Sequence, residues 1–103
     1  PTRHALEKAL ASIENGEYGL AFGSGLAAID AVIKLLKPGD EVISTNDLYG
    51  GTYRLFTKIF EGFGIKFHFT GMQTAHEVEK LVNANTKLIW VETPTNPMMN
   101  VVD

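Results

Sequence analysis

The chain has 103 residues, 45% hydrophobic and 20% charged, a length that allows at most one domain and a composition typical of globular proteins. Its net charge of −3, its nine basic residues without a run, and the lack of an apolar stretch long enough to span a bilayer favour neither nucleic acid nor a membrane as a partner. It contains no cysteine, which excludes disulfides and thiolate chemistry and is compatible with a reducing cytoplasm.

Apolar spacing and turn residues predict four helices that alternate with four strands. The first helix runs from Thr2 to Asn15, where Asn15-Gly16 is a good stop signal, and the first strand runs from Tyr18 to Phe22 and is expected to be buried. The other helices are expected at residues 26–36, 52–63 and 74–82, and the other strands at residues 41–45, 65–69 and 88–92.

Two of these helices carry further local signals. Helix 26–36 is apolar nearly all round, so we expect it to be buried, with Asp30 as a partnered structural carboxylate. Thr74 and Glu77 form a capping box at the start of helix 74–82.

The alternating order of helices and strands predicts an α/β fold with a parallel sheet and right-handed crossovers. In such sheets ligands bind beyond the carboxyl ends of the strands. Loops 23–26, 47–52 and 93–96 all follow predicted strands, so we expect them to converge on one site.

The first loop, Gly23-Ser24-Gly25-Leu26, joins a predicted strand to a helix and is suited to bind a phosphate. Two ligands fit it. The pattern G-x-G-x-x-A is a permitted dinucleotide fingerprint, with Asp47 ~20 residues further on. A monophosphate also fits, held by the Ser24 hydroxyl and the amides of Gly25 and Leu26. A turn without any ligand is the third possibility.

The second and third loops carry side chains that suit a planar, anionic ligand. Tyr49, followed by Gly50-Gly51, can lay its ring against a planar group, and Arg54 is within range of a carboxylate. Asn96 can donate and accept hydrogen bonds between two prolines that stiffen the loop, and Asn96-Pro97 is a candidate cis bond. The alternatives are a core tyrosine, an arginine paired with a surface carboxylate, and a rigid loop exit.

The three histidines, His4, His68 and His76, lack metal-ligand spacing, so we expect structural or solvent-facing roles and no metal site. The lysines fall on helix faces or strand flanks, and none lies in a glycine- or serine-rich active-site setting. No serine or cysteine nucleophile with its base is visible.

Taken together, four stretches resemble the Cys/Met-metabolism (trans-sulfuration) family of pyridoxal-phosphate enzymes, of the cystathionine γ-synthase and γ-lyase type. The resemblance covers essentially the whole chain, with the stretches in the family's order. They are Pro1-Thr2, Gly23-Ser24-Gly25-Leu26-Ala27-Ala28, Asp47-Leu48-Tyr49-Gly50-Gly51-Thr52 and Glu92-Thr93-Pro94-Thr95-Asn96-Pro97.

The resemblance implies the roles of the site residues. Tyr49 would stack on the pyridine ring, assist proton transfer as the catalytic residue and contact the substrate. Arg54 matches a position near the substrate, and Asn96 would lie close to the phenolic oxygen of the cofactor or the substrate carboxylate. The cofactor phosphate would be held by Ser24, Gly25 and Leu26.

The resemblance also implies that residues 1–103 are part of the PLP-binding large domain of the aspartate aminotransferase (type I) fold. The family's Tyr-x-Arg pair would precede this chain, and the aspartate that pairs with the pyridine nitrogen would follow it. The Schiff-base lysine, in a Ser-x-x-Lys context, and the arginine that binds the α-carboxylate would lie further on. Asp103 belongs to an Asn-x-x-Asp stretch and is not that aspartate. We therefore expect the chain alone to be inactive.

The favoured interpretation is a fragment of a cytoplasmic, homotetrameric enzyme that uses pyridoxal 5'-phosphate. It would catalyse γ-replacement or β/γ-elimination on cystathionine, homoserine esters or methionine. The first alternative is an NAD-type dinucleotide domain of an oxidoreductase, in which Asp47 binds a ribose. The second is a non-catalytic α/β interaction module that uses an exposed sheet edge.

Overall fold

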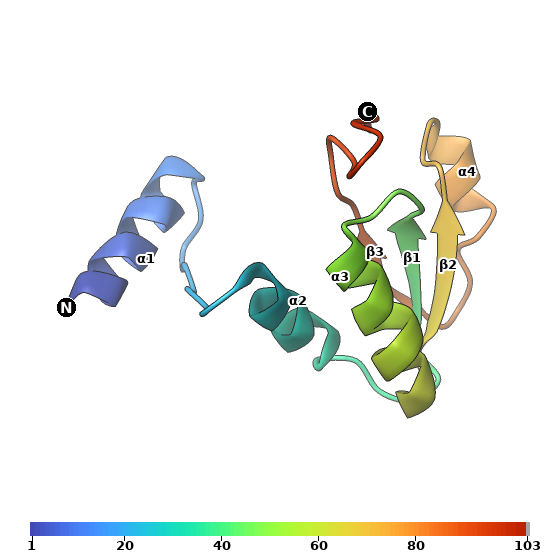
Figure 1. Ribbon diagram of the computed structural model, residues 1–103, viewed down its shortest axis with the longest axis horizontal. Coiled ribbons are helices and arrows are strands. Elements are labelled where there is room, and N and C mark those ends of the chain that lie inside the picture. The colour runs from blue at the N-terminus through green and yellow to red at the C-terminus, as the bar shows by residue number, and fades with distance from the viewer. Residues whose placement is uncertain (103) are drawn as a thin grey trace.

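The computed structural model describes residues 1–102 as a parallel sheet with helices packed on it and an N-terminal helix that stands apart (Figure 1). The strands are β1 (Glu41–Thr45), β2 (Lys66–Thr70) and β3 (Thr86–Trp90). The helices are α1 (Thr2–Ile13), α2 (Gly25–Ile33), α3 (Gly50–Arg54) and α4 (Ala75–Glu79). After α3 the helical run continues as a π-helix (Leu55–Phe60) and a 3₁₀ turn (Glu61–Phe63).

The sheet has the order β2-β1-β3, and both strand pairs are parallel. Val42 lies opposite Phe67 on one side and Leu88 on the other, with an irregularity between Glu41 and Val42 in the pairing to β3. The predicted α/β class and parallel sheet are therefore confirmed. Strand 41–45 has the predicted bounds, and the other two strands are shifted by one or two residues.

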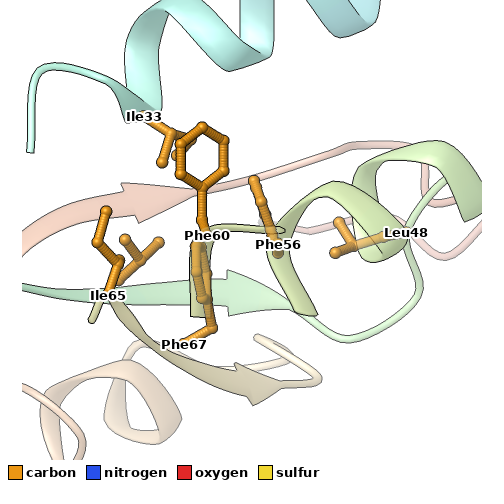
Figure 2. Close-up of a cluster of buried hydrophobic side chains, with 7 residues drawn as sticks. Ile33, Leu48, Phe56, Phe60, Ile65 and Phe67 are labelled. Atoms are coloured by element: carbon orange, nitrogen blue, oxygen red, sulfur yellow. The ribbon is translucent and has the colours of Figure 1, made fainter. Parts of the chain in front are cut away.

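The core lies between the sheet and the helical run 50–63, which crosses one face of the sheet (Figures 1 and 2). Phe56 is fully buried and stacks on Phe67, with ring centroids 4.5 Å apart, and it meets Trp90 edge-on at 6.0 Å. The other buried members of the cluster are Ile33 of α2, Val42, Leu48, Phe60 and Ile65. This packing holds the end of β1 and the start of α3 in place.

Helix α4 lies on the other face of the sheet. Ile89 alternates with Leu88 and Trp90, which pack on the core, and it lines a hollow with Val78 and Val82 from the helix and the turn that follows it. The predicted capping box is present, because the Thr74 hydroxyl accepts from the Glu77 amide and the Glu77 carboxylate accepts from the Thr74 amide.

The predicted strand from Tyr18 to Phe22 is wrong, since this segment has no strand neighbour among residues 1–102. Its polar groups bond to α1 instead: the Ala21 carbonyl accepts from Arg3 at 2.6 Å and the Ala21 amide donates to Glu7 at 2.7 Å. The segment is also exposed rather than buried, with Tyr18 81% accessible. A strand requires a partner for its backbone groups, and here side chains of α1 take that place.

The prediction that helix 26–36 is buried is also wrong. Only Ile33 of α2 is buried, and Val32 remains 37% exposed. The helix packs on the helical run 50–63 along one side, so its other apolar face is left uncovered in this chain. Asp30 does have the expected partner, because Lys34 lies 2.8 Å from its carboxylate.

Candidate functional site

The start of α2 forms one end of the candidate site. Ser24 is the N-cap, with extended backbone, and its hydroxyl accepts from the Ala27 amide at 3.1 Å. Within residues 1–102, the amides of Gly25 and Leu26 have no acceptor. Unpaired amides at a helix start carry partial positive charge, which the helix dipole increases. This turn is therefore suited to a phosphate, as its sequence predicts.

Predicted site residues of the first loop and Tyr49 of the second loop line one surface hollow of about 330 Å³. Its lining comes from the start of α2, from the loop and helix α3 that follow β1, and from the segment that follows β3. Of the predicted site residues, Ser24, Gly25, Leu26 and Tyr49 line it. Sequence reasoning did not single out its other lining residues, Ile29, Thr52 and Glu92.

The Tyr49 ring is half-exposed, in contrast to a core tyrosine. Its close approach to α3 depends on Gly51, since a Cβ there would lie 2.6 Å from Cε1 of Tyr49 and 3.1 Å from Cδ1 of Leu26. Glycine therefore lets the ring lie over the first turn of α3. An accessible aromatic ring at the rim of a hollow can stack on a planar ligand.

Glu92 links the segment after β3 to the backbone of Tyr49. Its carboxylate accepts from the Tyr49 amide at 3.1 Å and from the Trp90 indole at 3.4 Å, and its own amide donates to the Thr45 hydroxyl at 3.3 Å. Both carboxylate oxygens are thus engaged. Glu92 stands two residues after the end of β3, at the carboxyl edge of the sheet, where ligands bind in parallel sheets.

Thr52 carries the second unforeseen feature of the hollow. The residue is 1% exposed, and its hydroxyl has no hydrogen-bond partner among the described residues. A buried hydroxyl without a partner is unfavourable by ~1–3 kcal/mol. Together with the free amides at the start of α2, it gives the hollow unused hydrogen-bond donors, which fits a ligand rich in acceptor oxygens such as a phosphate ester.

Asp47 is committed to the loop that follows β3. Its Oδ2 accepts from the Thr95 hydroxyl at 2.6 Å and from the Met98 amide at 2.8 Å. In the dinucleotide alternative this carboxylate would bind a ribose. Because it already accepts two hydrogen bonds from the chain, the structure does not favour that alternative.

Asn96 and Arg54 lie outside the hollow. Both side chains are exposed. The Arg54 side chain folds back over Gly50, where an added Cβ would lie 3.2 Å from its Nη1. The Asn96-Pro97 bond is cis, as the sequence suggests, and so is Thr93-Pro94. The geometry therefore groups Ser24 to Leu26 with Tyr49 and leaves the predicted substrate contacts of Arg54 and Asn96 as predictions.

A polar cluster lies at the opposite end of the sheet. Glu41 accepts from His68 at 2.5 Å and from Asn83 at 3.0 Å, with Asn85 at 3.5 Å. These hydrogen bonds, that from His68 first, lower the pKa of Glu41 from 4.5 to about 2. The cluster is structural: it joins the start of β1 to the middle of β2 and to the turn before β3. Among residues 1–102, no three His, Asp or Glu side chains gather as metal ligands.

The helices of residues 1–102 include none with both the length and the apolar character needed to cross a membrane. Asp103 lies outside the described residues.

Comparison with solved structures identifies the structural class of this fold. A cystathionine gamma-lyase from Lactobacillus plantarum, complexed with L-serine, superposes on 99% of the chain with a TM-score of 0.96 and 42% identity. The chain matches 27% of that protein. The fold is thus the α/β architecture of PLP-dependent enzymes of the type I fold.

The sequence comparisons define the family. Residues 1–103 match the Cys/Met metabolism PLP-dependent enzyme family, and the chain belongs to it. It is 50% identical over 103 residues to a cystathionine gamma-lyase of Bacillus subtilis and 48% identical to a cystathionine gamma-synthase/O-acetylhomoserine (thiol)-lyase of the same organism. It is fully covered in both comparisons but spans only 27% and 28% of the lengths of these relatives.

Proposed function

We propose that the chain is part of the large domain of a longer, cytoplasmic and homotetrameric enzyme that binds pyridoxal 5'-phosphate. The enzyme would catalyse γ-replacement or β/γ-elimination on small sulfur amino acids and related substrates, such as cystathionine, homoserine esters or methionine. We expect neither nucleic acid nor a membrane as a partner. Family membership over all 103 residues supports the class, and the quarter-length coverage of relatives supports a longer protein.

The observation that carries the proposal is the hollow shared by an anion-binding helix start and an accessible tyrosine ring. The amides of Gly25 and Leu26 would bind the phosphate, with the Ser24 hydroxyl holding the helix start that presents them. The Tyr49 ring would stack on the planar ring, and its hydroxyl would move a proton near the substrate. When bound, pyridoxal phosphate withdraws electrons from the substrate and stabilises negative charge at Cα.

The test uses the longer protein that contains this chain, with cystathionine and an O-acylated homoserine as substrates. We expect a yellow protein whose cofactor borohydride fixes to one lysine, and turnover of at least one substrate. The products separate the reactions, because γ-elimination, β-elimination and γ-replacement release different sulfur and carbon compounds. A colourless protein that nicotinamide nucleotides protect against heat would contradict the proposal.

The role of Tyr49 has its own test. Tyr49→Ala removes the stacking ring, so we expect about tenfold weaker cofactor binding. Tyr49→Phe keeps the ring and removes the hydroxyl, so turnover should fall ~100-fold with binding retained. Tyr53→Phe, in helix α3, which Tyr49 precedes, is the matched control and should change neither. Unchanged binding and turnover in Tyr49→Phe would refute a part in proton transfer.

A further inference from the structure

The loop after β1 and the loop after β3 both carry proposed site residues. Each loop contributes a carboxylate that accepts hydrogen bonds from the other loop. Asp47, in the loop after β1, accepts from the Thr95 hydroxyl and the Met98 amide of the loop after β3. Glu92, in the loop after β3, accepts from the Tyr49 amide of the loop after β1. We name these contacts, at 2.6, 2.8 and 3.1 Å, the loop bridge.

The loop bridge continues into each loop. Thr95 is 3% exposed, and its hydroxyl donates to Asp47 while it accepts from the Asn100 amide at 2.8 Å. The Thr95 amide donates to the Asn100 carbonyl, also at 2.8 Å, so Thr95 is the centre about which residues 95–100 fold. Since Thr95 is held by Asp47, the shape of this loop depends on the loop after β1.

The loop bridge lies beside the residues that it would position. Tyr49 follows Asp47 by two residues, and its own amide is a donor in the bridge. Asn96 follows directly after Thr95. Each of these hydrogen bonds ties a donor of one loop to an acceptor of the other, so each carboxylate restrains the donors of the opposite loop.

We propose that Asp47 and Glu92 are positioning residues that make the two loops one mechanical unit, so that Tyr49 and Asn96 keep a fixed mutual placement. The inference rests on the proposed function for the role of those two side chains, but not for the bridge itself. Asp47 lies outside the hollow, and both oxygens of Glu92, which lines it, accept from the chain's own donors. Glu92 acts through the Tyr49 amide, and Asp47 acts through the Thr95 hydroxyl and the Met98 amide.

The chain offers variants that remove single contacts. Glu92 uses one oxygen for the Tyr49 amide and the other for the Trp90 indole, so Glu92→Gln loses one acceptor. Asp47 uses one oxygen for both donors, so Asp47→Asn can keep both bonds while Asp47→Ala removes them. The matched control is Glu61→Gln, because Glu61 is an exposed carboxylate at the end of the helical run 50–63.

The decisive measurement is hydrogen exchange, read by mass spectrometry, on the longer protein without cofactor. In Glu92→Gln and in Asp47→Ala we expect ~10-fold faster exchange in the loop that loses its acceptor and at least ~3-fold faster exchange in the other loop. The peptides to follow cover residues 46–54 and 92–102. Asp47→Asn and Glu61→Gln should exchange like the wild type.

Faster exchange in only one loop of Glu92→Gln would overturn the proposal, because the loops would then be held independently. If Asp47→Ala does not fold, Glu92→Gln and its effect on residues 92–102 still decide. In the cofactor-loaded protein, Glu92→Gln should shift the visible absorbance of the cofactor, whereas Asp47→Asn and Glu61→Gln should not. A protein that binds no cofactor would refute the proposed function and leave the exchange result intact.

Discussion

Glu41 is the residue whose ionisation the fold perturbs most clearly among those described. Hydrogen bonds from His68, Asn83 and Asn85 favour its charged form and lower its pKa to about 2. A carboxylate with a lowered pKa binds its proton less readily in the folded state than in the unfolded chain. Its contribution to stability is therefore fully present above pH 4.5 and is lost as the pH falls toward 2.

We expect Glu41→Gln to lose this pH-dependent contribution. The wild-type protein should unfold at a higher urea concentration than the variant at neutral pH, and the difference should shrink between pH 4.5 and about 2. Urea midpoints measured across that range for both proteins check this. Exposed Glu79→Gln is the control. A wild-type advantage that stays constant down to pH 2 would show that the hydrogen bonds do not favour the ionised form.

Only some residues of the candidate site could be predicted from the sequence. Ser24, Gly25 and Leu26 could be found because a glycine-rich turn before a helix has a local signature. Thr52 and Glu92 have none: their places in the hollow follow from how β1 and β3 lie side by side. Glu92, for example, accepts a hydrogen bond from the amide of Tyr49, which lies 43 residues earlier in the sequence.

At the scale of elements, the helix start at α2 is the part of the site with the plainest energetics. Ser24 caps α2 much as Thr74 caps α4, each through a side chain that accepts from an amide of the first turn. The loss of such a cap destabilises a helix by ~1 kcal/mol. Only the α2 cap lies in the hollow with Tyr49.

This pair of caps provides a matched experiment. Ser24→Ala and Thr74→Ala should each lower the thermal midpoint by a similar amount, since each removes ~1 kcal/mol of capping energy. Only Ser24→Ala should also weaken cofactor binding, because the amides that it leaves less ordered are those proposed to hold the phosphate. Titration of the longer protein with pyridoxal phosphate measures this. Equal affinities in the two variants would place the phosphate elsewhere.

Element prediction succeeded where local pattern and partners agree. Strand 41–45 has an apolar run, a turn before it and neighbours on both sides, and it has the expected bounds. The segment from Tyr18 to Phe22 has a similar apolar run but no neighbouring strand among residues 1–102, and it is not a strand. Propensity for strands depends on what the strand packs and pairs with, which the local sequence does not contain.

The molecule as a whole is elongated, with extents of 43 × 30 × 26 Å and a radius of gyration of 14.9 Å. A compact domain of this length has a radius of about 13 Å. The difference arises from α1, which stands apart from the sheet (Figure 1). Large apolar side chains are exposed there and along the following segment, among them Leu6 at 51%, Tyr18 at 81% and Leu20 at 77%.

We expect the 103-residue chain, prepared alone, to self-associate through this uncovered surface, because apolar patches of this kind favour association. Light scattering should report a mass above the monomer that rises with concentration. The double substitution Tyr18→Ser with Leu20→Ser should reduce it, and Lys58→Ser on the exposed side of the helical run should not. A monomer at all concentrations would show that the exposed side chains do not cause the chain to associate.

The central place of β1 in the sheet restricts how the Tyr49 loop can vary. On one side the Asn46 amide donates to the Thr70 carbonyl at 3.0 Å, and on the other the Thr45 hydroxyl accepts from the Glu92 amide. An inserted residue between Thr45 and Tyr49 would have to break one of these flanking bonds or move the ring. Among relatives, insertions should therefore be rejected in the loop after β1, which makes the length of this loop, rather than residue identity alone, a criterion for recognising this site.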